Sequence, residues 1–234
     1  MQLNRILLKL SGEALMGDKD HGIDPARLSQ YASEIIEAAS TGTEIAIVIG
    51  GGNIFRGLKG AADGMDRVSG DYIGMMATVI NSVALQAELE KQGAKTVLFS
   101  GMLIRPLARP MSAASAIKEL SKGKIILISG GTGNPYFTTD SASALRALEI
   151  KANIILKGTR VDGVYSADPE KNADATKFEQ LSFDEALDKG LRIMDQTAFT
   201  LCKENSMPIY VFNMNIQGNL KKVLAGTNIG TLIS

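Results

Sequence analysis

Short, continuous apolar runs rich in β-branched residues recur along the whole chain and limit what it can fold into. Continuous runs, rather than alternating ones, are typical of strands that are buried on both faces of a parallel sheet. Each fully buried Ile or Val contributes about 1.5–3 kcal/mol, so these strands can supply the main core. The runs lie at residues 6–10, 45–49, 96–99, 125–128, 154–156 and 209–212.

Helical patterns separate these runs. Asp24 followed by Pro25 is typical of a helix start, because an N-cap residue then precedes a proline in the first turn. The alternation of strand and helix predicts an α/β fold, a three-layer αβα sandwich around a mainly parallel sheet. No segment resembles a linker, so residues 1–234 are expected to form a single domain. Apolar residues between 79 and 89 predict a long helix that ends at Gly93, and further helices are predicted at residues 141–150, 184–189 and 197–205.

Charge and composition exclude several function classes. Lys plus Arg and Asp plus Glu both number 25, so no overall field favours nucleic acid or an anionic membrane. No apolar stretch approaches the roughly 18 residues of a membrane span, and the first residues lack a signal-peptide pattern, so we expect a cytoplasmic protein. The one cysteine, Cys202, and the one histidine, His21, leave too few ligands for a zinc site, and no resident metal is expected.

Glycine-containing loops follow three of the predicted strands, at residues 11–12, 50–53 and 130–135. Because the carboxyl ends of parallel strands meet at one edge of a sheet, these loops would surround a single crevice. Glycines let backbone N–H groups approach an anion closely, and a helix N-terminus adds about half a positive charge. Each loop alone could equally be a tight turn. Together they favour a site for two phosphorylated ligands.

The common nucleotide-binding fingerprints are absent from the sequence. It contains neither a G-x-x-x-x-G-K-[ST] P-loop nor a G-x-G-x-x-G dinucleotide loop, which argues against P-loop NTPases and conventional NAD-binding domains. Lys9, at the end of the first predicted strand, could instead supply the positive charge that a transferring phosphoryl group requires. A solvated surface lysine is the alternative interpretation.

One ordered pattern joins three segments: Lys-Leu-Ser-Gly-Glu at residues 9–13, Gly-Gly-Gly-Asn-Ile-Phe-Arg-Gly at residues 50–57, and Gly-Thr-Gly-Asn-Pro-Tyr-Phe-Thr-Thr-Asp at residues 131–140. This pattern resembles the amino acid kinase superfamily and, within it, the bacterial uridylate kinase family. The third segment is the most specific part. The resemblance covers nearly the whole chain in order, and it continues through Asp71 and residues 157–165, 167–169 and 211–214.

The resemblance implies a nucleotide site that is built from these segments. It makes Lys9, Arg56 and Asp140 the catalytic residues. On the residues alone, Asp140 could be a helix N-cap, Tyr165 a core aromatic and Asp168 a turn residue. The implied ATP-binding residues are Lys9, Leu10, Ser11, Gly12, Gly52, Arg56, Thr159, Tyr165 and Asp168. The implied UMP-binding residues are Gly51, Asp71, Thr132, Gly133, Asn134, Pro135, Tyr136, Phe137, Thr138 and Thr139.

The implied reaction is transfer of the γ-phosphoryl group of ATP, with Mg²⁺, to UMP, as a step of pyrimidine nucleotide (CTP) biosynthesis. Such a transfer depends on positioning and charge, so Lys9 and Arg56 would offset the developing negative charge while Asp140 orients Lys9. The resemblance also implies a homohexamer and feedback inhibition by UTP. GTP activation is not implied, because His21 occupies a position that is often aromatic in the family.

There are two alternatives, one from within the same superfamily and one from another class of protein. An acyl-phosphate-forming amino acid kinase would carry a lysine in a Gly-Gly-Met-x-x-Lys stretch, but residues 190–196 read Gly-Leu-Arg-Ile-Met-Asp-Gln. Asp195 in this stretch matches the uridylate kinase pattern instead. A non-catalytic nucleotide sensor would have no need of Lys9, Arg56 and Asp140 together.

Overall fold

The computed structural model describes residues 3–55, 64–172 and 174–234. Within these residues, nine strands form one sheet in the order β4-β3-β5-β2-β1-β6-β10-β11-β9. Neighbouring strands are parallel except β10 and β11, which are antiparallel. The strands are β1 (Arg5–Leu10), β2 (Glu44–Ile49), β3 (Thr96–Ser100), β4 (Arg109–Pro110), β5 (Ile125–Ser129), β6 (Ile154–Thr159), β9 (Gln180–Leu181), β10 (Ile209–Asn213) and β11 (Thr231–Ile233).

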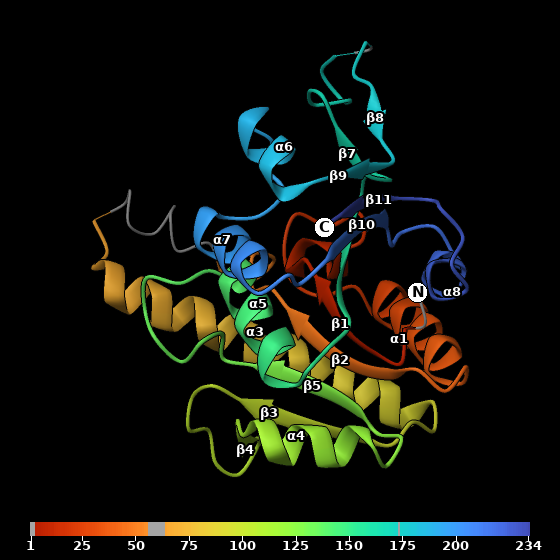
Figure 1. Cartoon of the computed structure of the whole chain (residues 1–234). Helices are drawn as coiled ribbons and strands as arrows, with labels where there is room; N and C mark the ends of the chain where they lie inside the picture. Colours follow the sequence, from red (N-terminus) through yellow and green to blue (C-terminus); the bar gives the residue numbers. More distant parts are fainter. Residues whose placement is uncertain (1–2, 56–63, 173) are drawn as a thin grey trace.

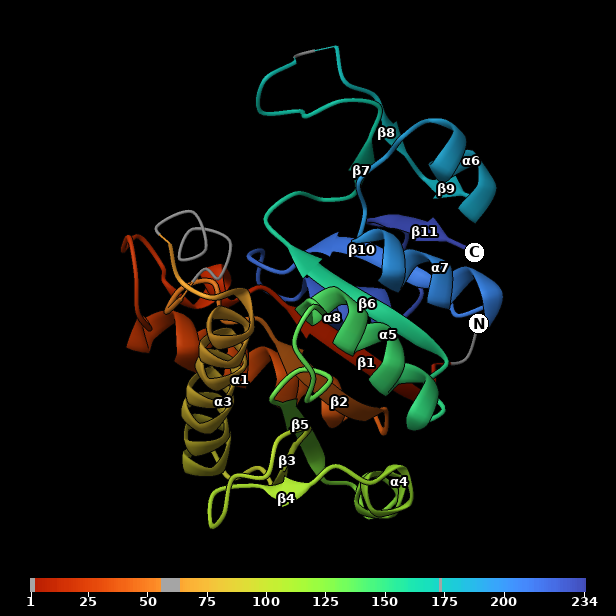
Figure 2. The ribbon, with the colours of Figure 1, turned by 90° about the vertical axis from the view of Figure 1, so that its left-hand side faces the viewer.

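Helices cover both faces of this sheet (Figure 1). Along β1, Ile6 and Leu8 pack in a buried cluster with α1, α3 and α8, whereas Leu7 packs on the opposite face with α4, α5 and α7. Figure 2 shows α5 and α7 on one side of the sheet and α1 and α3 on the other. The helices are the 3-10 helix η1 (Gly12–Leu15), α1 (Pro25–Ala39), α3 (Arg67–Lys91), α4 (Ala113–Leu120), α5 (Thr139–Glu149), α6 (Phe183–Asp188), α7 (Gln196–Glu204) and α8 (Asn219–Leu224).

The three-layer α/β architecture predicted from the sequence is confirmed. All six apolar runs are strands, namely β1, β2, β3, β5, β6 and β10. Asp24 caps α1 as predicted, because its side chain accepts a hydrogen bond of 2.9 Å from the Arg27 backbone N–H. The short helices α4 and α8 and the strands of two or three residues were not predicted, since such elements depend on tertiary contacts more than on a periodic pattern. That residues 1–234 form a single domain stays a prediction.

A small antiparallel pair, β7 (Val164–Tyr165) and β8 (Lys177–Phe178), follows β6 outside the main sheet. Figure 1 shows this hairpin beyond the edge of the sheet, near α6. The hairpin lies beyond the carboxyl end of β6. It therefore adds a wall to the edge of the sheet where the glycine loops lie. Across the described part of the chain, no helix combines the length and the apolar composition needed to cross a membrane.

Candidate active site

The loops after β1 and β2 pack against each other at the carboxyl edge of the sheet. A Cβ atom added to Gly12 would lie 2.5 Å from the Gly50 carbonyl oxygen, and one added to Gly51 would lie 2.7 Å from the Cβ atom of Ala77 on α3. Only glycine permits these approaches of backbone to backbone and of backbone to helix. Both loops and the middle of α3 therefore form one continuous wall.

Asn53, the last residue of the Gly-Gly-Gly-Asn segment, has a structural role in this wall. Its side-chain amide pairs reciprocally with that of Asn81 on α3, with N···O distances of 3.0 and 2.7 Å. Asn81 also donates to the Gly50 carbonyl at 2.7 Å, and Asn53 donates to the Gly22 carbonyl at 2.8 Å. Because Asn53 and Asn81 are buried, these bonds satisfy their amides and fix the loop after β2.

Two lysines share one aspartate where β1, β6 and α5 meet. Lys9 Nζ lies 2.8 Å from Asp140 Oδ1, and Lys157 Nζ lies 3.4 Å from Asp140 Oδ2. The side chains of Lys9, Lys157 and Asp140 are only 12%, 14% and 18% exposed. Lys157 also donates a hydrogen bond to the Ile193 carbonyl. We call these three side chains the Lys–Asp–Lys cluster.

The cluster perturbs the pKa values of Asp140 and Lys157. Burial opposes ionisation of Asp140, but the charges of Lys9 and Lys157 outweigh it and hold the pKa of Asp140 below its usual value. Burial, followed by the like charge of Lys9, lowers the pKa of Lys157 to about 8, although Asp140 opposes this shift. Asp140 is therefore ionised at neutral pH. Lys157 can lose its proton in mildly alkaline solution.

Asp140 is not the N-cap of α5, so that alternative interpretation is wrong. Thr138 caps the helix, and its hydroxyl accepts from the backbone N–H groups of Asp140 and Ser141. The Thr138 hydroxyl in turn donates to Asp195, the N-cap of α7, which also accepts from the Ser141 hydroxyl at 3.0 Å. The start of α5 is thus tied to the start of α7, and the Asp140 carboxylate is left to the two lysines.

A central cavity of about 280 Å³ opens over the cluster. Its position at the strand ends, with backbone amides on one side and lysine on another, suits a phosphate group. Cys202, buried in α7 nearby, has its pKa raised to about 12 by burial and then by Asp140 and Asp195, so its thiol is protonated at neutral pH. The walls of the central cavity are Lys9, Ser11, Gly12, Gly50, Gly51, Gly52, Thr138, Thr139, Asp140 and Asp195.

A second cavity, of about 340 Å³, lies beside the first against α3, and we call it the α3 cavity. The two cavities share Gly51, Gly52, Thr138 and Thr139, so they are continuous. Asp71 and Phe137, both predicted UMP-binding residues, line the α3 cavity. Its walls are Gly51, Gly52, Phe55, Arg67, Gly70, Asp71, Gly74, Met75, Thr78, Gly131, Phe137, Thr138 and Thr139.

The third cavity, of about 650 Å³, lies under the β7–β8 hairpin, and we call it the hairpin cavity. Thr159, Tyr165 and Asp168, all predicted ATP-binding residues, line it, and so does Lys157 of the cluster. Asp168 is also a turn residue, since its carboxylate accepts from the Glu170 backbone N–H at 3.0 Å.

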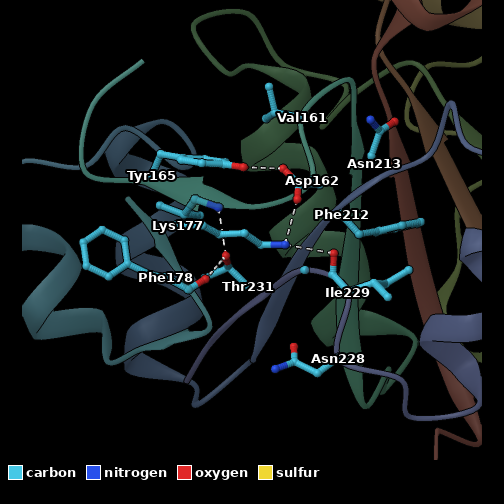
Figure 3. Close-up of polar contacts among 12 residues, drawn as sticks. Val161, Asp162, Tyr165, Lys177, Phe178, Phe212, Asn213, Asn228, Ile229 and Thr231 are labelled. Carbon is cyan, nitrogen blue, oxygen red and sulfur yellow. Dashed lines mark hydrogen bonds and ion pairs between the residues drawn. The ribbon is translucent and has the colours of Figure 1, made fainter. Parts of the chain in front are cut away.

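Polar contacts hold this hairpin in place (Figure 3). The Tyr165 hydroxyl donates to Asp162 Oδ1 at 2.6 Å, and Lys177 Nζ donates to Asp162 Oδ2 at 2.9 Å. Lys177 also donates to the Ile229 carbonyl at 3.1 Å, and the Thr231 hydroxyl accepts from the Val164 backbone N–H at 2.9 Å. The Tyr165 side chain, which lines the hairpin cavity, is thereby anchored to the segment just before β11 of the main sheet.

The structure does not place every predicted site residue in the walls of the three cavities. The side chain of Leu10 is fully buried in the core, so only its backbone could meet a nucleotide. Residues 132–136, of which Asn134 and Tyr136 are exposed, do not line any of the three cavities in the described structure. Arg56 lies outside the described residues.

Several site residues were not predicted, and Lys157 and Asp195 are the main ones. A lysine directly after the apolar run at residues 154–156 resembles the placement of Lys9 near the end of its own run, and this was the available signal. Asp195 precedes a predicted helix and could have been recognised as an N-cap. Arg67 and Phe55 carry no comparable signal, because only the approach of α3 to the glycine loops brings them to the α3 cavity.

Glycine loops and a mostly buried cationic cluster at the carboxyl ends of the strands, with cavities beside them, are features of an α/β enzyme of the phosphoryl-transfer class. The sequence model of the Amino acid kinase family matches residues 4–213. The chain is 56% identical over 232 residues to the uridylate kinase of Parabacteroides distasonis, and the match covers 99% of this chain and 98% of that relative. The chain belongs to the amino acid kinase family and, within it, to the uridylate kinases.

Solved structures agree with this assignment. The crystal structure of UMP kinase from Bacillus anthracis is 35% identical, with a TM-score of 0.96 over 100% of this chain and 97% of that one. The crystal structure of UMP kinase from Ureaplasma parvum is 38% identical, with a TM-score of 0.93 over 100% of both chains. The family and fold class expected from the sequence are confirmed.

Proposed function

We propose that this chain transfers the γ-phosphoryl group of ATP to UMP and forms ADP and UDP. The observation that carries the proposal is the central cavity over the Lys–Asp–Lys cluster, in a chain whose relatives are named uridylate kinase. The central cavity shares walls with the α3 cavity on one side, and Lys157 of the cluster lines the hairpin cavity on the other. ATP would occupy the hairpin cavity, with its phosphates directed at Lys9, Ser11 and Gly12. UMP would occupy the α3 cavity, with its phosphate at the shared wall of Gly51, Gly52 and Thr139.

In this reaction an oxygen of the UMP phosphate attacks the γ-phosphorus of ATP in line. The new P–O bond forms as the bond to the β–γ bridging oxygen breaks, and ADP leaves with that electron pair. No protein side chain needs to form a covalent bond, because positioning and charge carry such a transfer. Lys9 would offset the charge on the transferred group, and Asp140 would orient Lys9. The predicted role of Arg56 is the same as that of Lys9.

Mg²⁺ would enter as part of the substrate, the Mg²⁺ complex of ATP. Among the described residues, no group of three or more Asp, Glu, His or Cys side chains could hold a metal ion. Both oxygens of Asp140 are close to lysine ammonium groups, so this carboxylate is already paired with two cationic side chains. Mg²⁺ is often held largely by substrate phosphates and water, which agrees with this arrangement.

The remaining expectations extend the proposal. A homohexamer is supported by apolar side chains on α3 that are exposed in the single chain, at 41% for Tyr72, 43% for Met76 and 51% for Ile80. Feedback inhibition by UTP, a place in CTP biosynthesis and a cytoplasmic location stay predictions. His21 lies in an exposed loop, and no role is assigned to it.

Release of ADP, measured in a coupled assay with ATP and Mg²⁺ against a panel of acceptors, tests the proposal. The panel contains UMP, dUMP, CMP, AMP, GMP, acetylglutamate and aspartate. We expect turnover confined largely to UMP. Turnover with an amino acid would instead favour an acyl-phosphate-forming kinase. Binding of UMP without turnover of any acceptor would favour a nucleotide sensor.

A further inference from the structure

Lys157 is a charged group at the site that has no role in the proposed reaction as described above. In the parallel pairing of β1 and β6 it is the register partner of Lys9, so the two strands carry their lysines side by side on one face of the sheet. Two like charges that are mostly withdrawn from water repel each other unless an anion separates them. Asp140 fills that role, with one oxygen toward each lysine.

Lys157 also occupies a distinctive place between the cavities. It lines the hairpin cavity, whereas Lys9 and Asp140 line the central cavity. Its contact with Asp140 is therefore the link between the proposed ATP site and the transfer centre. On its other side, Lys157 holds the Ile193 carbonyl in the segment that leads into α7.

Charged and titratable groups face Lys157 from most of the surrounding elements. Lys9 comes from β1, Asp140 from α5, and Asp195 from the N-cap of α7. On β10 its register partner is the apolar Val211. The other titratable groups around it are Asp168, Tyr165, Lys189 and Arg192 in the walls of the hairpin cavity, and the buried thiol of Cys202 on α7.

We propose that Lys157 is a positioning residue for phosphoryl transfer, which acts by holding Asp140 from the side of the hairpin cavity. This inference rests on the proposed kinase function. With Lys157 in place, one carboxylate is divided between two ammonium groups, so Lys9 keeps positive charge for the transferred phosphoryl group. Without Lys157, Asp140 pairs with Lys9 alone and neutralises much of that charge.

A purely structural role for Lys157 makes a different prediction. If the lysine served only to fix the Ile193 carbonyl, its protonation would not matter to catalysis once the protein is folded. In the positioning role the charge itself matters, so kcat/KM of the free enzyme falls as pH rises through the pKa of Lys157, which is about 8. Bound phosphates favour the protonated lysine, so the corresponding fall in kcat lies at higher pH.

The test is steady-state kinetics of the full chain with Mg²⁺, ATP and UMP, from about pH 6 to about pH 10. The variants are Lys157→Met, Lys157→Arg and, as a matched control, Lys118→Met on the exposed side of α4. For Lys157→Met we expect kcat at neutral pH to fall about 10- to 100-fold, as is typical when a residue that orients a functional ligand is lost. We expect the KM for ATP to change less, and the alkaline fall in kcat/KM to disappear.

Lys157→Arg keeps its charge at every pH tested, so it should recover part of kcat and show no alkaline fall. Thermal unfolding and calorimetric binding of UMP establish that each variant is folded. If Lys157→Arg does not fold, the pH profiles of the wild type and Lys157→Met are sufficient to test the positioning role. The control variant, Lys118→Met, should have the same kcat, KM and pH profile as the wild type.

Three results would overturn the positioning role. They are wild-type kcat in Lys157→Met, a higher KM for ATP at unchanged kcat, and an alkaline fall that persists with the same midpoint in both Lys157 variants. A wild-type protein that releases no ADP with UMP would overturn the proposed function, and this inference with it. An active wild type with normal Lys157 variants would overturn the inference alone.

Discussion

Asp71 on α3 accepts a hydrogen bond from the backbone N–H of Tyr136, 2.7 Å away, and so joins the helix to the loop after β5. Tyr136 has a φ of 71°, a left-handed conformation that costs a non-glycine residue roughly 1–2 kcal/mol. Arg67 reinforces the junction, because its Nε lies 2.8 Å from Asp71 Oδ2 and its guanidinium stacks 5.7 Å from the Tyr136 ring centre. The shape of the α3 cavity therefore depends on Asp71.

Asp71→Asn should raise the KM for UMP by about 10-fold or more, since hydrogen bonds to a charged group contribute about 1.5–3 kcal/mol. The KM for ATP should change little, because the hairpin cavity does not contain Asp71. Initial rates with each nucleotide varied in turn measure both constants. Asp188→Asn, on the exposed part of α6, is the control. An unchanged KM for UMP would remove Asp71 from the acceptor site.

Lys9→Met should lower kcat by about 10²- to 10³-fold, as loss of one preorganised donor to the transition state typically does. The α3 cavity does not include Lys9, so calorimetry should find UMP binding close to that of the wild type. The comparison is made at saturating ATP and UMP, which separates the chemical step from binding. Near-normal turnover in this variant would contradict the role of Lys9.

Gly12→Ala should destabilise the protein by about 1–3 kcal/mol, the usual cost of overpacking, because the new Cβ would lie 2.5 Å from the Gly50 carbonyl oxygen. Gly74→Ala is a matched comparison, for which the expected change in stability has the opposite sign. A Cβ atom there meets nothing within 4 Å, so Gly74→Ala in α3 should stabilise by about 0.5–1 kcal/mol. Denaturant unfolding of both variants measures the two changes, and equal effects would refute the packing argument.

The sequence predicted the parts of the fold that depend on local pattern, and missed those that depend on register. The apolar runs identified every long strand, and the resemblance identified Lys9 and Asp140 before their contact was seen. Lys157 was missed as a site residue because its role arises from the alignment of β6 with β1 and the approach of α5, which no local pattern encodes. The absence of residues 132–136 from the walls of the three cavities likewise follows from tertiary packing.

Tyr165→Phe should raise the KM for ATP by about 2- to 10-fold, because a neutral hydrogen bond contributes about 0.5–1.5 kcal/mol. The lost bond is the one from the Tyr165 hydroxyl to Asp162, which helps to fix the hairpin over its cavity. Lys177 still pairs with Asp162, so the effect should stay small. The KM for UMP should not change. A change confined to UMP would show that the hairpin cavity is not the ATP site.

Lys157 should also make stability depend on pH in an unusual direction. Its pKa falls from the ordinary 10.5 to about 8 in the folded protein, so the unfolded chain binds more protons between these two values. Stability rises with pH wherever the unfolded state binds more protons, so this lysine makes a contribution that increases from about pH 8 to 10.5.

Lys157→Met lacks this titration. The difference in free energy of unfolding between wild type and Lys157→Met should therefore shift in favour of the wild type as pH rises through that window. Denaturant unfolding at matched protein concentration and several pH values measures the difference. A difference that stays constant with pH would mean that Lys157 keeps its ordinary pKa when folded, and that burial beside Lys9 does not perturb it.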